Sequence, residues 1–177
     1  MILFDTSVLS QVFRRRQSGQ EERRLQRIVE ELMYGGTPLG IPGIVLQEVL
    51  SGIHSEKQFA KLADQLLAAF TIILPSATDH IEAAQMRNRC MAKGLSVSGP
   101  DCLIAAMAIS GEYMLFTSDN DFKVLSKHTP LKLFSNYSGG GFRLLGCRKS
   151  CAITRNSERL NGPTSLRPLD PVNAKHG

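Results

Sequence analysis

The chain has 177 residues, of which 42% are hydrophobic and 21% charged, and its formal net charge is +5 at pH 7. This length and apolar content fit one α/β domain with a substantial core, without a second full domain. No apolar run approaches the roughly 18 residues of a membrane span, and the start of the chain turns acidic too soon for a signal peptide. We therefore expect a cytoplasmic protein that does not bind a membrane.

The net positive charge is confined to the C-terminal quarter of the chain. Residues 1–134 contain 14 Lys and Arg against 14 Asp and Glu, whereas residues 135–177 contain 7 against 2. The later segment is Gly-rich and basic without a sustained hydrophobic period, which is typical of disorder. We therefore expect one folded domain over 1–134 and a disordered extension over 135–177. The basic pI belongs to the extension and gives the domain little support for nucleic-acid binding.

Short apolar runs alternate with helical patterns along the domain. The first half predicts a strand at 2–4, a helix from about 8, a helix at 21–34, a strand at 39–41, helices at 44–53 and 57–70, and a strand at 71–75. The second half predicts a helix capped at Thr78 or Asp79 and ending near 94, a helix at 102–109, a strand at 114–116, a helix entered through the turn 117–122, and a strand at 131–134. This alternation predicts a three-layer α/β/α sandwich with a mostly parallel central sheet.

Acidic residues stand where predicted strands meet predicted helices: Asp5, Glu48, Asp101, Asp119 and Asp121. Ligands of such sheets collect at the carboxyl ends of the strands, where Asp5 and Asp119 fall. Two like charges about 4 Å apart repel by roughly 4 kcal/mol at an effective dielectric near 20, so converging carboxylates need a cation. Mg²⁺ and Mn²⁺ take carboxylate and water oxygens, and the acids therefore predict a metal site suited to hydrolysis.

Each acid also has a plain structural explanation. Asp5 and Asp119 could simply cap helices, and Asp101 and Asp121 could be favourable charges in a first helical turn. Glu48 lies in an apolar helix, where a carboxylate is either solvated or paired. The shared site is favoured because all five occupy equivalent junctions.

Other polar residues give weaker indications. Thr117, Ser118 and Ser7 could orient water or phosphate, or could serve only as turn and cap residues. The four His and four Cys of the chain lack the close spacing of a zinc site. Cys90 and Cys102 lie in apolar helical stretches, so we expect buried thiols without a structural disulfide.

Four short motifs together resemble the successive motifs of PIN-domain ribonucleases. They are Phe4-Asp5-Thr6-Ser7-Val8-Leu9, Gln47-Glu48-Val49-Leu50-Ser51-Gly52, Pro100-Asp101-Cys102-Leu103-Ile104-Ala105-Ala106 and Thr117-Ser118-Asp119-Asn120-Asp121-Phe122. The resemblance covers residues 1–134 in the family's order and is closest, in length and spacing, to VapC-type toxins of prokaryotic toxin–antitoxin pairs. It implies a PIN-like fold and an endoribonuclease that depends on Mg²⁺ or Mn²⁺. It also implies a cognate antitoxin that holds the enzyme inactive, and a homodimer.

The acids and the resemblance lead to one hypothesis, metal-assisted hydrolysis of RNA phosphodiester bonds. Asp5, Asp101 and Asp119 would bind one or two cations, and Glu48 and Asp121 would act directly or through water. Bound metal would activate a water for attack on phosphorus and neutralise the phosphoryl oxygens.

Two alternatives come from other classes of protein. In a catalytically silent binding module the PIN-like fold would persist, with the atypical extension blocking the site. A phosphohydrolase of the haloacid dehalogenase type would use Asp5 as a nucleophile, but it needs a second Asp two residues later, where this chain has Ser7.

Substrate and partner contacts are less sharply indicated. The arginines at 14–16 and Arg23, Arg24 and Arg27 could touch RNA phosphates or could form solvated helix faces. A groove between the helices at 21–34 and 57–70 is the expected surface for the antitoxin.

Overall fold

The computed structural model of the chain describes residues 1–14 and 19–135. Its centre is a five-stranded sheet in the order β3-β2-β1-β4-β5, and every strand pairing in the described residues is parallel. The strands are β1 (Ile2–Phe4), β2 (Leu39–Pro42), β3 (Thr71–Ile73), β4 (Met114–Phe116) and β5 (Lys132–Leu133). The predicted class, α/β with a largely parallel sheet, is confirmed.

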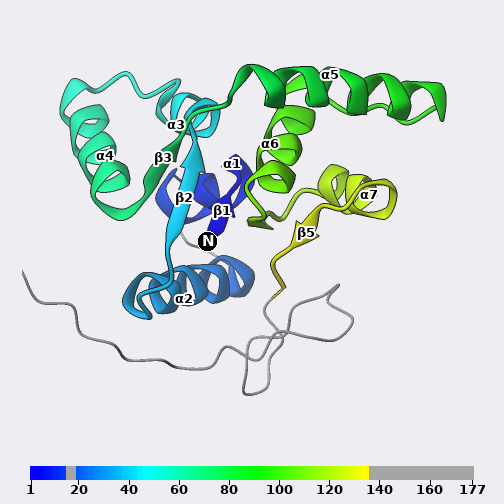
Figure 1. The fold of residues 1–177 in the computed structure, drawn as a ribbon. Coiled ribbons are helices and arrows are strands. Elements are labelled where there is room, and N and C mark those ends of the chain that lie inside the picture. Colours follow the sequence, from blue (N-terminus) through cyan, green and yellow to red (C-terminus); the bar gives the residue numbers. More distant parts are fainter. Residues whose placement is uncertain (15–18, 136–177) are drawn as a thin grey trace, which may run out of the picture. The chain divides into compact units, whose positions relative to one another are not determined.

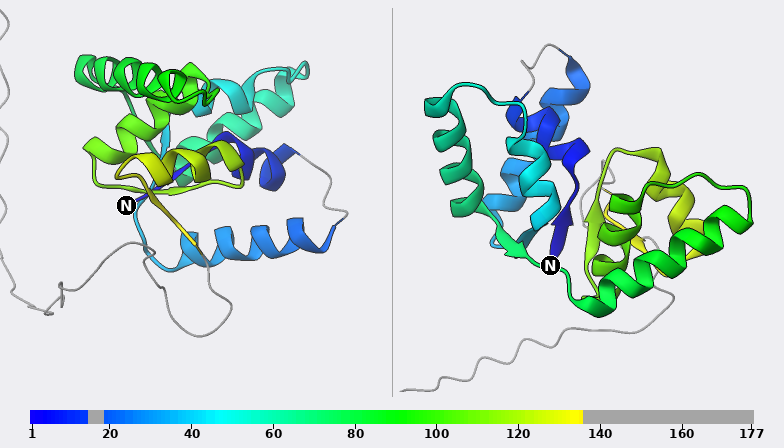
Figure 2. Two further views of the ribbon diagram at one scale, coloured as in Figure 1. Left: turned by 90° about the vertical axis from the view of Figure 1, so that its right-hand side faces the viewer. Right: turned by 90° about the horizontal axis from the view of Figure 1, so that it is seen from above.

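Helices cover both faces of this sheet. They are α1 (Thr6–Leu9), the π-helical turn η1 (Ser10–Arg14), α2 (Gln20–Tyr34), α3 (Gly43–Leu50), α4 (Glu56–Ala69), α5 (Ala77–Ala92), α6 (Gly99–Ser110) and α7 (Asn120–His128). Figures 1 and 2 show α1 to α4 on one side of β1 and α5 to α7 on the other. Right-handed crossovers require this division, because the chain moves outward through β2 and β3 and then returns to β4 and β5. The three predicted layers are therefore present.

The central strand β1 is the most deeply buried part of the sheet. Its three residues are at most 1% exposed, and the Phe4 ring lies 5.1 Å from the Phe70 ring and 5.2 Å from the Phe116 ring, centroid to centroid. Beyond the strand, the Asp5 N–H donates to the Phe116 carbonyl at 3.0 Å. Pairing with β4 thus continues to the first acid, which fixes its backbone beside the end of the neighbouring strand.

Several element boundaries differ from the predicted ones. The helix predicted over 44–53 ends at Leu50, because Ser51 is extended and Gly52 has a φ of 80°, a left-handed conformation that glycine adopts at little cost. The strand predicted over 71–75 stops at Ile73. The cap of α5 is Ser76, and neither Thr78 nor Asp79 takes that place.

Several expectations concern residues that the structure does not describe. Residues 136–177 of the predicted extension over 135–177 lie outside the described residues, as do the arginines at 15 and 16. Cys90 and Cys102 are described, and both are buried free thiols. Among the described helices, none has the length and apolar character needed to cross a membrane.

A buried carboxylate joins α5 to α6. Asp79 is 8% exposed and accepts hydrogen bonds from the Ser76 N–H at 2.8 Å, the Ser76 hydroxyl at 2.7 Å and the Ser110 hydroxyl at 2.6 Å. The bond from Ser110 is the largest cause that lowers the pKa of Asp79 below its ordinary value. The ionised carboxylate therefore stabilises the fold above the unfolded-state pKa, and this contribution is lost as the pH falls through the folded-state pKa.

Asp79→Ala is expected to lower the free energy of unfolding by about 2 kcal/mol at pH 7, because three donors lose a charged acceptor. Urea denaturation at a series of pH values measures this, and the difference from the wild type should shrink below about pH 4. Asp64→Ala, at an exposed position of α4, is the control and should change little. An equal loss at pH 3 and pH 7 would contradict the ionic role.

Candidate functional site

The first acid lies at the carboxyl end of the central strand and is almost fully buried. Asp5 is 5% exposed and caps α1, where its Oδ2 accepts a hydrogen bond from the Ser7 N–H at 3.2 Å. The same oxygen accepts from the Thr117 hydroxyl at 3.0 Å. A carboxylate is costly to bury unless it is paired or hydrogen-bonded. Asp5 is therefore both a cap and a link to the segment that follows β4.

Thr117 connects that segment to α1. Its single hydroxyl proton goes to Asp5, so its oxygen acts as acceptor for the Asp119 N–H at 2.9 Å and for the Ser7 hydroxyl at 3.3 Å. The Ser7 oxygen in turn accepts from the Ser118 N–H at 3.0 Å. Gln11 of η1 adds a bond to the Ser118 hydroxyl at 2.9 Å. These bonds hold residues 117–119 against the start of α1.

Asp119 and Asp121 occupy the start of α7. Asp119 is exposed and caps the helix, with its Oδ1 accepting from the Asp121 N–H at 2.9 Å. Asp121 is half-buried in the first turn, where a negative charge is favoured by the helix dipole. The structural roles considered for both residues are thus real. They do not compete with a role in the site, because each carboxylate retains oxygen lone pairs for other partners.

Glu48 reaches the same region from α3. The Thr6 hydroxyl, one residue beyond Asp5, donates to the Glu48 Oε2 at 2.5 Å. Both side chains are half-buried, and α1 packs directly on α3. The open question of whether this carboxylate is solvated or paired is therefore answered: it is paired with a neutral donor beside Asp5.

Asp101 lies in the first turn of α6, which Ser98 caps. Ser98 accepts from the Asp101 N–H at 3.1 Å and donates its hydroxyl to the Asp101 Oδ2 at 2.5 Å. Burial is the largest cause that raises the pKa of Asp101 above its ordinary value, and the bond from Ser98 opposes it. The negative charges of Asp5, Asp119 and Asp121 raise this pKa further. Asp101 therefore lies close enough in space to three of the other four predicted acids to be repelled by them.

The same acids do not form a closed metal cage. Within residues 1–14 and 19–135, no three His, Cys, Asp or Glu side chains converge closely enough to hold one metal ion. The donor set around Asp101 consists of carboxylate oxygens, the ligands of hard divalent cations. Mg²⁺ commonly keeps several waters and uses only one or two protein carboxylates. The spread arrangement therefore fits a partly hydrated ion better than one ligated by protein alone.

Two contacts of the site escaped the sequence analysis. The hydrogen bond from Thr6 to Glu48 joins residues 42 positions apart, and no local pattern around Thr6 predicts it. Ser98 was detectable, because Ser-x-x-Asp before an apolar helix is a capping-box pattern that also describes Ser76 and Asp79. The basic residues of α2 lie farther from the acids than the sequence analysis assumed for RNA contacts. Figures 1 and 2 show α2 near the amino ends of the strands, whereas α1 starts at the carboxyl end of β1 beside Asp5.

Asp101→Asn is expected to raise the melting temperature at neutral pH. Burial and the neighbouring carboxylates raise the pKa of Asp101 in the folded state, so its ionised form at pH 7 costs stability that a neutral Asn does not. The stability linked to this group is complete below the unfolded-state pKa and is lost as the pH rises through the folded-state pKa. Scanning calorimetry should show a gain of a few degrees at most at pH 7, which disappears near pH 3. A lower melting temperature for the variant at pH 7 would contradict the repulsion.

Thr6→Val should lower the free energy of unfolding by about 1 kcal/mol, because it removes the donor to Glu48 and keeps the side-chain shape. Thr6→Ser retains the hydroxyl and serves as the matched control. Urea denaturation of a double-mutant cycle with Glu48→Ala isolates the pair. Equal costs of Thr6→Val with and without Glu48 would show that the bond contributes nothing.

The fold and the sequence are both similar to known proteins. A sequence model described as the PIN domain matches residues 2–128. Similar solved structures include FitAcB from Neisseria gonorrhoeae, with 23% identity, coverage of 71% of this chain and 94% of that chain, and a TM-score of 0.58. VapBC2 from Rickettsia felis bound to a promoter DNA fragment has 25% identity, coverages of 70% and 92%, and a TM-score of 0.57. A toxin–antitoxin complex from Klebsiella pneumoniae has 25% identity, coverages of 69% and 90%, and a TM-score of 0.54.

No curated protein sequence matches this chain. The domain match alone nevertheless spans most of it and includes all five acids. The chain belongs to the PIN domain family.

Proposed function

We propose that this protein is a metal-dependent endoribonuclease and the toxin of a type II toxin–antitoxin pair. The observation that carries the proposal is the gathering of carboxylates from three elements: Thr117 joins Asp5 to the backbone of Asp119 at the start of α7, and Asp101 of α6 lies close enough to sense their charges. Burial is the largest cause that raises the pKa of Asp101, and the charges of Asp5, Asp119 and Asp121 raise it further. Such a cluster costs stability in the free protein, and perturbed carboxylates in one region are typical of functional sites. The PIN fold supplies the context, because nucleases of this family are hydrolases.

The proposed roles follow the positions of the acids. Asp5, Asp101 and Asp119 would hold one or two Mg²⁺ or Mn²⁺ ions, and Glu48 and Asp121 would contribute directly or through water. When bound, the ion supplies an acidified water and positive charge for the phosphoryl oxygens. The protein's own contribution is orientation, because a displacement of a positioned group by about 1 Å can cost 100-fold in rate.

The hydroxyl network supports this orientation. Thr117 fixes the rotamer of Asp5 and the backbone of Asp119 with one side chain. Thr6 donates to one oxygen of Glu48, and Ser98 donates to one oxygen of Asp101. Asp5, Glu48 and Asp101 are thus each held by a neutral hydroxyl donor, and for Asp5 and Glu48 this donor lies far away in the sequence.

The partners proposed are an RNA substrate, a cognate antitoxin and a second copy of the chain. The structures described above with similar folds include toxin–antitoxin complexes, which supports the antitoxin. Large apolar side chains are exposed on the two helices expected to flank its groove: Met33 and Tyr34 on α2, and Phe59 and Leu67 on α4. Leu74 before α5 and Ile81 within it are 76% and 58% exposed and supply an apolar surface for dimerisation.

A cleavage assay on total RNA tests the activity. We expect cleavage by the full chain with Mg²⁺ or Mn²⁺, its loss in EDTA, and a fall of at least about 100-fold in Asp5→Asn, the scale on which a positioned catalytic group acts. Asp64→Asn, an exposed change on α4, should keep wild-type activity. Cleavage that survives EDTA or Asp5→Asn would refute the proposal, and metal binding without any cleavage would favour the silent binding module.

Growth of a host cell tests the partner together with the activity. Residues 1–134 and the full chain are expressed with and without the product of the neighbouring gene. Growth arrest is expected from an active chain, and both Asp5→Asn and the neighbouring product should relieve it. Arrest that persists in the Asn variant would count against nuclease action. Comparison of the two lengths also tests whether residues 135–177 suppress the activity.

A further inference from the structure

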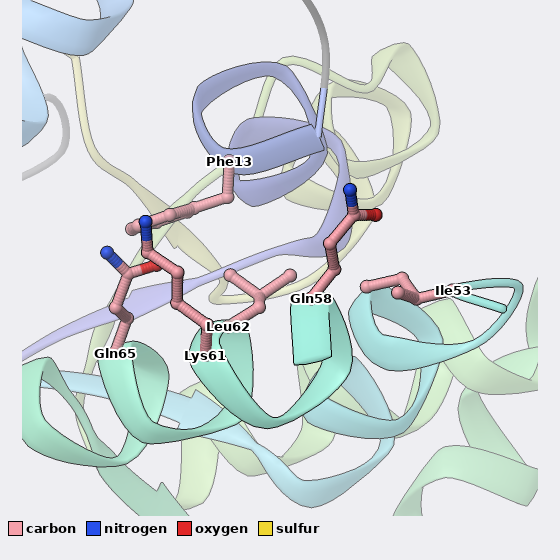
Figure 3. Close-up of a pocket in the computed structure, with 6 residues that line it drawn as sticks. All are labelled: Phe13, Ile53, Gln58, Lys61, Leu62 and Gln65. Atoms are coloured by element: carbon pink, nitrogen blue, oxygen red, sulfur yellow. The ribbon is translucent and has the colours of Figure 1, made fainter. Parts of the chain in front are cut away.

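A pocket of about 310 Å³ opens between η1 and α4. Figure 3 shows the Phe13 ring of η1 above Leu62 of α4, with the heads of Lys61 and Gln65 extending toward the ring and Gln58 rising on the side of Ile53. Its volume is near the lower end of the range for ligand sites, roughly 300–1,000 Å³. The space therefore suits one small planar group better than a whole secondary-structure element.

Two residues that line this pocket, Phe13 and Ile53, follow the elements that position Asp5 and Glu48. Phe13 follows Thr6 by seven residues in one nearly continuous run of helix, a rise of about 10 Å. Ile53 follows Glu48 by five residues, beyond the end of α3. A ligand that fills the pocket and also reaches the carboxylates would therefore have to span about two helical turns, the separation of Phe13 from Thr6.

The lining combines apolar faces with polar edges. Phe13, Ile53 and Leu62 are apolar, and Gln58, Lys61 and Gln65 share one face of α4 at spacings of three and four residues. Lys61 is the charged member of the six, and the carboxylates of α4, Glu56 and Asp64, do not line the pocket. The local charge therefore favours an anionic ligand, in contrast to the acid cluster nearby.

A nucleobase has the chemistry that this lining matches. Bases stack on aromatic and apolar side chains, and their edges present donors and acceptors that a Gln amide can pair at once. A Lys ammonium attracts the adjacent phosphate. An apolar protein side chain would bury Leu62 and Phe13 equally well, but it would leave the two amides without partners at a desolvation cost.

We propose that this pocket binds one base of the RNA substrate, a nucleotide that flanks the cleaved bond. The inference rests on the proposed nuclease function and gives that site a specificity element. Phe13 supplies the stacking surface, Gln58 and Gln65 read the base edge, and Lys61 contacts phosphate. Preference for the RNA sequence beside the cut would then originate in α4, outside the acid cluster.

The test couples the pocket to one position of the RNA. The probe is a short fluorescent RNA that spans a bond cut by the wild type, with one abasic nucleotide placed at each position in turn. Anisotropy is measured with Mg²⁺ on full-length Asp5→Asn, with and without Phe13→Leu. At one position the abasic substitution should weaken binding about five-fold or more, and this loss should vanish when Phe13 is Leu.

Matched variants separate recognition from folding. Gln65→Leu changes an exposed side chain and should alter which base is preferred at that position, whereas Phe59→Leu, an aromatic residue of α4 outside the pocket, should not. Lys61→Gln should reduce the salt slope of binding by about 0.7, while Lys57→Gln leaves it unchanged. In cleavage assays of the wild-type background the pocket variants should raise KM and leave kcat near normal.

Three results would overturn the inference in distinguishable ways. If no abasic position depends on Phe13 while metal-dependent cleavage is intact, the pocket proposal fails alone. If the pocket variants weaken neutralisation by the neighbouring gene product and leave RNA binding unchanged, the pocket holds a protein side chain. If the wild-type chain cuts no RNA, the pocket proposal and the nuclease function fail together.

Discussion

The hydrogen bond from Thr117 to Asp5 is the contact on which the arrangement of the acids depends. Asp5 ends the central strand, its N–H pairs with Phe116, and its carboxylate holds Thr117, which in turn accepts from the backbone of Asp119. Strands β1 and β4 are therefore joined beyond their last residues by side-chain bonds. Because β1 is almost wholly buried in the sheet, the position of the site is set by the core, and any change that loosens β1 or β4 would spread the acids apart.

Repulsion limits how closely these acids can approach in the protein alone. Each is stabilised by a neutral donor or a helix start, and the cost appears at Asp101, whose pKa is raised by burial and by three neighbouring charges. Bringing three carboxylates to ligating distance without a cation would raise that cost further. Among the described residues, the acids accordingly do not converge into a closed cage. A cation would supply the attraction that the protein lacks.

The sequence predicted what depends on local pattern and missed what depends on distant partners. Alternation of apolar runs with helical periods was enough for the parallel sheet and its layers. The prediction that all five acids stand where a strand meets a helix holds for Asp5, Asp119 and Asp121, but Glu48 lies in the last turn of α3 and Asp101 lies in the first turn of a helix that follows α5 and a loop. The end of α3 at Leu50 was missed, because apolar residues continue to Ile53 and the left-handed Gly52 overrides that periodicity. The bond between Thr6 and Glu48 spans 42 residues and needs the packing of α1 on α3, which no periodicity contains.

The two parts of the proposed substrate site have opposite charge and share their supporting elements. The segment from Asp5 to Phe13 has an acid at its start and a pocket-lining residue at its end. The segment from Glu48 in α3 to Ile53 likewise joins an acid to a pocket-lining residue. An RNA substrate would use both the acid cluster and the pocket. Its phosphate can approach the carboxylates only through a cation, whereas its base gains contact area in the pocket. Base stacking beside Lys61 offsets part of the repulsion between phosphate and the acids, and it orients the strand before the metal is engaged. An antitoxin segment lying on α4 would cover this pocket, so it could stop cleavage by excluding the base and leave the carboxylates untouched.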